Sequence, residues 1–285
     1  MSHQQTIEKI KKDLSDNVFV IDALRDTFKG KTALVISAGP SAESWKEIYE
    51  KEKHNYPVVI CIKQTLNLID VPCDIHFINS ANLIKYEYQS NTLSVMTRNS
   101  KAAPVFGKYD VGFKIMEGFN YKPRYYLATN KCFDCYTLDK TGIYRPLGPG
   151  IMHESVFYTL VHMGFKRIVT IGWDVADSTG GNRHFGEVKD KGQDKPYESS
   201  KVKIKIKKIL SYFKLESIYG KIGFSKRYVK GFINYYLGNK VNLAGMAIGE
   251  AEIVSSSIES LKKWLQKNDV ILDINSHSGW VNKGK

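Results

Sequence analysis

Short runs of consecutive apolar residues divide this chain into buried strands, separated by segments of helical periodicity. The runs lie at residues 32–38, 56–62, 74–80, 93–97, 167–173 and 270–274. Because they are continuous rather than alternating, they predict strands covered on both faces, as in a parallel sheet. Apolar residues at helical spacing predict helices at about residues 1–28, 41–53, 151–163 and 254–266. This alternation predicts an α/β fold with a Rossmann-like, mostly parallel sheet flanked by helices.

The chain is expected to form one core with additions at the N-terminus and in a lid. Near the N-terminus, apolar residues recur at near-helical spacing, at Ile7, Ile10, Leu14, Val18 and Ile21. Residues 1–30 are therefore predicted as a helix that packs on the sheet from outside. Residues 31–174 form the nucleotide-binding core, with irregular structure and short strands over residues 100–148. Residues 175–245 form a basic helical lid or insertion, and residues 246–285 return a helix and a strand to the core.

Positive charge is unevenly distributed and is densest in the predicted lid. The chain of 285 residues has 42 Lys and Arg against 29 Asp and Glu, a formal net charge of +13. A basic stretch interleaved with aromatic residues begins at Lys201-Val-Lys-Ile-Lys-Ile-Lys-Lys208. One interpretation is a solvated lid whose aromatic residues pack on the core, and another is a surface that binds an anionic membrane. Nucleic acid is disfavoured because no recognised nucleic-acid-binding motif accompanies the cations.

The sequence predicts a cytoplasmic protein, either free or attached peripherally to the inner face of the membrane. The N-terminus lacks the apolar segment of a secretory signal, and no run approaches the roughly 18 apolar residues of a membrane span. The chain has four cysteines, which fit a reducing compartment. Cys132 and Cys135 have CxxC spacing, but no second pair completes a zinc site, so ordinary thiols are the favoured interpretation.

A glycine turn after the first core strand is the first candidate binding element. Gly39-Pro40-Ser41 opens a helix whose unpaired N–H groups could bind a phosphate. Neither a Gly-x-Gly-x-x-Gly motif nor a Walker A loop is present, which disfavours NAD and P-loop chemistry. The alternative is a plain strand-to-helix turn in which Pro40 and Ser41 only start the helix.

Further candidates follow the other strands, at the edge where ligands of open α/β sheets bind. They are Lys63 and Gln64 after the second core strand, Asn79 and Ser80 after the third, Gly148 and Gly150 before the helix at 151–163, and Asp174 after the strand at 167–173. Lys63 could neutralise a phosphate, Asn79 could bind a base or ribose, and the two later glycines could hold a second phosphate or a carboxylate. Loop polarity and helix capping are the alternatives.

Two features of the sequence concern the type of reaction: a histidine that could act as a general base, and the absence of paired acidic residues that could bind a metal. His184 lies on a polar loop after the strand at residues 167–173, and the ordinary pKa of histidine suits a general base near neutrality. No Asp-x-Asp pair occurs in the sheet half, which disfavours a metal-bound nucleotide sugar. The sequence therefore predicts no metal site.

The order and spacing of these motifs resemble two known families. The resemblance rests on four motifs, which are the strand–Gly-Pro-Ser–helix unit, Cys61-Ile-Lys-Gln64, Phe77-Ile-Asn-Ser80 and Gly164-Phe-Lys-Arg-Ile-Val-Thr-Ile-Gly-Trp-Asp174. Together they resemble the bacterial sialyltransferases of glycosyltransferase family 42. They also resemble a family of motility accessory factors and archaeal 6-hydroxymethylpterin pyrophosphokinase-like proteins, to which the Gly-Trp-Asp ending is more similar. The resemblance covers about residues 31–80 and 145–190.

The resemblance to sialyltransferases implies a modified Rossmann domain with a flexible lid, a CMP-activated sugar as donor, and no metal. By position, it implies that the nucleotide is bordered by Gly39 to Ser41, Lys63, Gln64 and Asn79. The chain departs from that pattern at four places: Ala38 and Lys63 replace asparagines, Ala176 replaces a tyrosine, and Gly249-Glu250 stands where the histidine base is expected. Glu250 or His184 would then act as the base.

These observations predict a metal-independent glycosyltransferase with His184, Glu250 and Asp174 as candidate catalytic residues. It would move CMP-sialic acid, or a related CMP-2-keto acid sugar, onto a lipopolysaccharide or capsule glycan or a lipid-linked precursor. Two alternatives are an ATP- and Mg²⁺-dependent pyrophosphokinase of the 6-hydroxymethylpterin type and a member that only binds glycans. The expected partners are the nucleotide-sugar donor, a glycan or glycolipid acceptor and an anionic membrane surface. No separate cofactor is expected, and a homo-oligomer is left open.

Overall fold

The computed structural model describes residues 2–14, 18–78, 92–97, 113–117, 119–122, 137–139, 142–146, 151–174 and 248–275. The elements in chain order are α1 (His3–Asp13), β1 (Val18–Val20), η1 (Ile21–Leu24), β2 (Thr32–Ile36), η2 (Pro40–Ser44), α2 (Trp45–Glu52), η3 (Lys53–Asn55), β3 (Val58–Ile62), η4 (Lys63–Asn67), β4 (Ile75–Ile78), β5 (Leu93–Thr97), β6 (Phe113–Glu117), β7 (Phe119–Lys122), β8 (Thr137–Asp139), β9 (Gly142–Pro146), η5 (Met152–Val156), α5 (Phe157–His162), β10 (Arg167–Ile171), α8 (Ile248–Lys267) and β11 (Ile271–Asn275).

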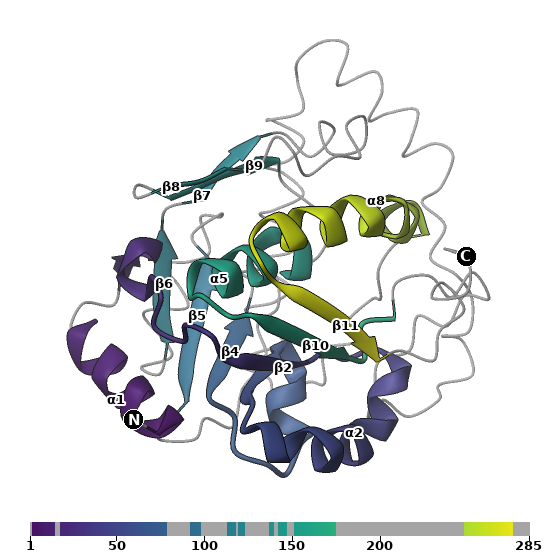
Figure 1. Ribbon diagram of the computed structural model, residues 1–285, viewed down its shortest axis with the longest axis horizontal. Coiled ribbons are helices and arrows are strands. Elements are labelled where there is room, and N and C mark those ends of the chain that lie inside the picture. The colour runs from purple at the N-terminus through teal and green to yellow at the C-terminus, as the bar shows by residue number, and fades with distance from the viewer. Residues whose placement is uncertain are drawn as a thin grey trace, which may run out of the picture.

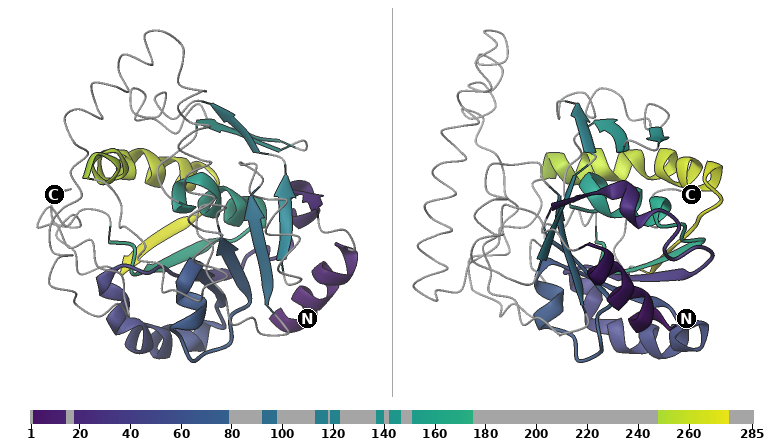
Figure 2. Two further views of the ribbon diagram at one scale, coloured as in Figure 1. Left: turned by 180° about the vertical axis from the view of Figure 1, so that it is seen from behind. Right: turned by 90° about the vertical axis from the view of Figure 1, so that its left-hand side faces the viewer.

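One parallel sheet organises the described residues. Its eight strands lie in the order β1-β6-β5-β4-β3-β2-β10-β11, and every neighbouring pair is parallel. Figure 1 shows α5 and α8 over one face of this sheet and α2 over the other. The predicted α/β fold with a Rossmann-like sheet is therefore confirmed. A second sheet of three short strands, β7-β9-β8, lies next to the end of β6 (Figures 1 and 2), within the region where short strands were predicted.

Each face of the sheet is buried under its own apolar layer. One layer joins alternate residues of the strands, such as Ala33 and Val35, to α1, α5 and α8. The other joins the intervening residues, such as Leu34 and Ile36, to Trp45 of α2. Burial on both faces explains why β2, β3, β4 and β10 are continuous apolar runs rather than alternating ones. None of the described helices has the length and apolar character needed to cross a membrane.

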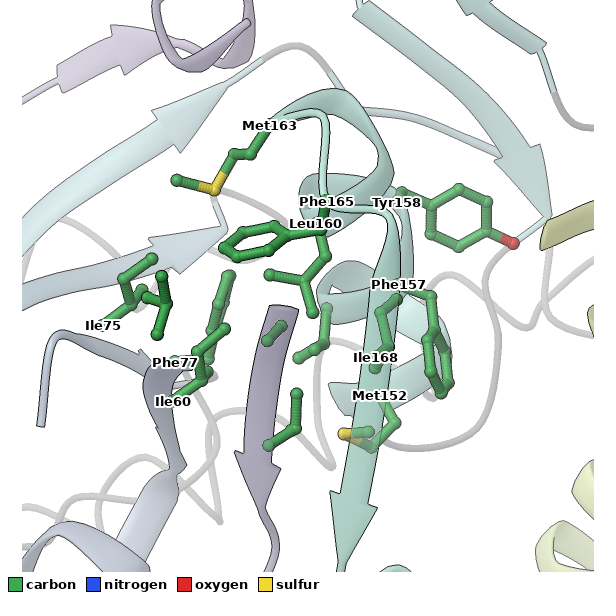
Figure 3. Packing of buried hydrophobic residues seen from close by; sticks show 14 of the residues in the cluster. Ile60, Ile75, Phe77, Met152, Phe157, Tyr158, Leu160, Met163, Phe165 and Ile168 are labelled. Atoms are coloured by element: carbon green, nitrogen blue, oxygen red, sulfur yellow. The ribbon is translucent and has the colours of Figure 1, made fainter. Parts of the chain in front are cut away.

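The helix before β10 is the centre of the larger apolar layer. Leu160 and Met163 point toward the side chains of β3 and β4 in Figure 3, among them Ile60, Ile75 and Phe77. Tyr158 extends in the opposite direction, and its ring lies 4.9 Å from the ring of Trp264 on α8, centroid to centroid. Both rings are buried, so α8 is fixed to the core through this helix. The predicted helix at residues 151–163 is confirmed, although its first turns, Met152–Val156, are π-helical.

An ion-pair network ties β10 to its neighbours at the amino edge of the sheet. The Arg167 guanidinium donates two hydrogen bonds to Glu52, at 2.6 and 3.0 Å, and one to Asp273 at 2.5 Å. The Glu52 side chain is only 8 % exposed, so this pair is largely shielded from water. The hydrogen bond from Arg167 outweighs burial and lowers the pKa of Glu52. The network therefore connects α2, β10 and β11.

The N-terminal segment corrects the sequence analysis. The helix predicted to run to about residue 28 ends at Asp13, and residues 18–20 form β1, an edge strand that pairs with β6. The residues Ile7, Ile10, Leu14 and Ile21 are nonetheless all buried in the core. Their near-helical spacing therefore reflects burial on one side of the sheet and not a single helix.

Candidate functional site

The strand order reverses between β2 and β10, and this is where an open α/β sheet has its binding crevice. From β2 the sheet continues through β3, β4 and β5 on one side and through β10 and β11 on the other. The loops that follow β2 and β10 therefore leave the same edge of the sheet, side by side. Ligands of this architecture bind outside the carboxyl ends of the strands at such a reversal. Gly39 follows β2 and Asp174 follows β10, so two of the predicted site segments meet there.

The two loops are held together by backbone hydrogen bonds. The N–H of Ser37 donates to the carbonyl of Ile171, and the N–H of Gly39 donates to the carbonyl of Gly172, each at 2.8 Å. A Cβ atom on Gly39 would lie 2.4 Å from the Gly172 carbonyl oxygen, and one on Gly172 would lie 2.3 Å from the Ser37 carbonyl oxygen. Both positions therefore require glycine for close backbone approach, and Gly172 also has a φ of +67°.

Asp174 bridges the loops at the start of η2. Its carboxylate accepts a hydrogen bond from the backbone N–H of Ser41 at 2.7 Å, between residues 133 positions apart in sequence. A carboxylate at the first turn of a helix satisfies a free N–H and complements the helix dipole. The chain therefore already supplies an anion at the turn where the sequence analysis expected a phosphate. A phosphate bound at the Ser41 amide would meet this carboxylate.

Two buried oxygens at this edge have no hydrogen-bond partner among the described residues. They are Ser41 Oγ, in η2, and Gln64 Oε1, in η4. A buried polar atom without a partner costs about 1–3 kcal/mol, and such atoms in a native fold call for an explanation, such as a ligand. Both residues were predicted as site residues from their positions after buried strands. The structure adds that these two oxygens are shielded from solvent.

The turn after β3 is bound to both neighbouring strands. Thr65 Oγ1 accepts from the N–H of Ile62 at 2.8 Å and lies 3.0 Å from the Ile36 carbonyl at the end of β2. On the other side, His76 Nε2 of β4 lies 2.8 Å from the Lys63 carbonyl oxygen. Lys63 itself has a φ of +52°, a left-handed conformation that costs a residue other than glycine about 1–2 kcal/mol. The surrounding hydrogen bonds therefore hold a strained residue in place.

Thr65 and His76 were not predicted as site residues, although the sequence contains a signal for His76. A histidine in the middle of a continuous apolar strand needs hydrogen-bond partners, because burying its polar ring without them destabilises the fold. His76 is completely buried, and burial lowers its pKa to about 4, so the ring is neutral near neutral pH. Thr65 has no comparable signal, because threonine is ordinary in a turn.

The N-terminus of the helix before β10 also lies at this edge. Ser37 Oγ donates to the Met152 sulfur at 3.6 Å, which brings the first turns of that helix against the loop after β2. Those turns are π-helical, a local distortion often found at functional sites. Gly148 and Gly150, which the sequence analysis assigned to an anion, precede this helix and lie outside the described residues.

The remaining predicted residues stay predictions. Asn79, Ser80 and His184 lie outside the described residues, as does the lid at residues 175–245. Glu250 lies in the first turn of α8, where only the backbone is described. Pro40 begins η2, as predicted for a residue that starts a helix. Across the described segments, no three His, Cys, Asp or Glu side chains gather as metal ligands.

Residues 5–180 match the family described as 6-hydroxymethylpterin diphosphokinase MptE-like. The match begins in α1 and extends just past β10, so it includes every described residue of the candidate site. No curated protein matches the chain.

Proposed function

The chain belongs to the MptE-like family, and we propose that it is a nucleotide-dependent transferase whose donor binds at the carboxyl ends of β2, β3 and β10. The observation that carries this proposal is the pair of buried oxygens, Ser41 Oγ and Gln64 Oε1, that lack partners among the described residues beside the strand reversal. Hydroxyl and amino groups of a ribose and a base are the hydrogen-bond donors that would satisfy them.

The anionic part of the donor is proposed to lie at Lys63. The alternative position, the Ser41 amide, is bound by the Asp174 carboxylate at 2.7 Å. The Asp174 carboxylate would repel a phosphate bound at the Ser41 amide, whereas the ammonium group of Lys63 would attract a phosphate. Lys63 follows β3 directly, next to Gln64, so one turn would contact both the polar and the charged parts of the nucleotide.

The proposed donor is a CMP-activated 2-keto acid sugar such as CMP-sialic acid. Its support is the order of the motifs along the chain, and no separate cofactor or metal is required. The acceptor hydroxyl oxygen would bond to the anomeric carbon as the bond to the phosphate oxygen breaks, and CMP would leave with that electron pair. The hydroxyl proton would pass to a base, for which Glu250 and His184 are the candidates. Lys63 would stabilise the departing phosphate.

The acceptor is proposed to be a cell-surface glycan or its lipid-linked precursor. The net charge of +13, densest over residues 201–230, supports an encounter with an anionic membrane that carries such an acceptor. In this proposal Asp174 acts by fixing the loop after β2, because its carboxylate is held by the Ser41 N–H.

A second candidate function is transfer of diphosphate from ATP to a pterin alcohol. The description of the matched family and the Asp174 carboxylate at the strand reversal favour it. Mg²⁺ is commonly bound by one or two carboxylates together with substrate phosphates, so Asp174 would be the residue to hold it. This activity would need ATP and Mg²⁺ together.

Thermal unfolding with CMP, CDP, UDP, GDP and ATP, each with Mg²⁺ or with EDTA, separates these functions. A ligand at 100 times its dissociation constant stabilises the fold by about 2.7 kcal/mol. Stabilisation by CMP in EDTA is the result we expect. If ATP is the one nucleotide that stabilises the fold, and does so only when Mg²⁺ is present, the diphosphokinase function is supported instead. If no nucleotide stabilises the fold, both proposed functions are contradicted.

A further inference from the structure

The side chain of His76 binds the backbone of Lys63 from the neighbouring strand. With a φ of +52°, the Lys63 backbone turns abruptly at the end of β3, and its carbonyl oxygen accepts a hydrogen bond from His76 Nε2 at 2.8 Å. His76 lies on the adjacent strand, opposite Cys61 in the β3–β4 pairing. A left-handed conformation at a lysine persists only where the surroundings determine it. This hydrogen bond is one such constraint, imposed from the neighbouring strand.

The hydrogen bonds also fix the proton on the His76 ring. A carbonyl oxygen only accepts, so Nε2 carries the hydrogen and Nδ1 is the acceptor. Nδ1 faces the hydroxyl of Ser94 on β5 at 3.5 Å. His76 is completely buried, and no solvent reaches the ring. The ring therefore links β5 to the turn after β3, and both of its nitrogens have partners within the protein.

We propose that His76 is a positioning residue, which holds the Lys63 turn so that the lysine ammonium meets the anionic part of the donor. This inference rests on the proposed function, because it takes Lys63 as the residue that binds the donor phosphate. The inference goes beyond the proposed function by assigning a role to His76, whose ring is buried in the core. It also explains why a polar side chain occupies the centre of an otherwise apolar strand.

Two substitutions of His76 separate the hydrogen bond from mere filling of the core. His76→Leu fills the space but has no donor, whereas the amide nitrogen of His76→Gln can occupy the place of Nε2. Thr170→Val is a matched control, since Thr170 is buried in β10 and its hydroxyl has no hydrogen-bond partner among the described residues. Lys63→Met removes the ammonium and leaves His76 in place.

The first measurement is amide hydrogen exchange over residues 63–67, which does not depend on any ligand. We expect faster exchange in His76→Leu, and exchange close to wild type in His76→Gln and Thr170→Val. Unchanged exchange in His76→Leu would overturn the proposal, whatever the chain binds.

The second measurement is CMP affinity by titration calorimetry, with Lys63→Met and His76→Leu combined in a double-mutant cycle. Each single substitution is expected to weaken binding about tenfold, and the double substitution by little more than either. If the loss of affinity in the double substitution equals the product of the two single losses, His76 does not act through Lys63 and the proposal is overturned. If the wild-type chain binds no nucleotide, the proposed function is wrong, and the exchange experiment alone decides whether His76 holds the turn.

Discussion

Gly39 leaves no space for even a methyl group, and its replacement by alanine tests whether the two loops at the strand reversal are packed as described. A Cβ atom there would lie 2.4 Å from both the Asp174 carboxylate and the Gly172 carbonyl oxygen. The φ of Gly39 is −70°, which alanine adopts without strain, so the cost is steric alone. Because one of the clashing atoms belongs to the backbone, side-chain rotation cannot relieve the contact.

The cost follows from the hydrogen bonds that separation of the loops would break. Gly39→Ala is expected to lose the bond from its own N–H to Gly172 and the bond from Ser41 to the Asp174 carboxylate. A neutral hydrogen bond contributes about 0.5–1.5 kcal/mol and one to a charged group about 1.5–3 kcal/mol. The sum predicts a loss of about 2–4.5 kcal/mol in the free energy of unfolding, or roughly 3–8 °C in Tm for a chain of 285 residues.

Urea and thermal unfolding of Gly39→Ala measure this loss, and CMP titration measures its effect on the site. Gly30→Ala is the matched control, because no atom lies within 4 Å of its Cβ position and only its φ of +77° opposes the substitution. The control should lose about 1 kcal/mol and keep its nucleotide affinity. If Gly39→Ala were as stable as wild type within about 0.5 kcal/mol, the loops could not be packed in this way.

Substitutions at three further residues test other parts of the structure. The hydrogen bond from Arg167 lowers the pKa of Glu52 in the folded chain. The ionised Glu52 side chain therefore stabilises the fold above pH 4.5, and this stabilisation is lost as the pH falls through the lowered pKa. The urea midpoint of wild type should therefore exceed that of Glu52→Gln at pH 7 by more than at pH 3, and an equal difference would contradict the pairing. Asp174→Ala should lose about 1.5–3 kcal/mol of stability, whereas Asp174→Asn, which keeps an acceptor, should lose less; equal losses would exclude the hydrogen bond. Trp264→Ala should cost about 3–5 kcal/mol because the ring packs on Tyr158 in the core, and a loss below about 1 kcal/mol would show that α8 is not fixed there.

The strands were predictable because their burial on both faces is a local property of the sequence. The run at residues 93–97 matches β5 at both ends, and the other predicted strands differ from the observed ones by one or two residues at an end. The N-terminal strand β1 was missed because its three residues join the sheet only through pairing with β6, 97 positions later in the chain. No local pattern contains that information.

The site was predictable as a set of positions but not as an arrangement. Residues after buried strands were expected to line the sheet edge, and Gly39, Ser41, Lys63, Gln64 and Asp174 do follow strands at that edge. The bond between Ser41 and Asp174 depends on the register of β2 against β10, which is a tertiary property. The left-handed backbone of Lys63 could not be predicted either, because nothing in its sequence neighbourhood favours it.

Release of CMP from CMP-sialic acid, measured in EDTA with a glycolipid acceptor present, shows whether the chain is a metal-independent transferase. We expect the wild-type chain to release CMP without metal, and Lys63→Met to release it at least about tenfold more slowly. The contradicting result is no release of CMP from any CMP-sugar, together with formation of AMP from ATP, Mg²⁺ and 6-hydroxymethylpterin.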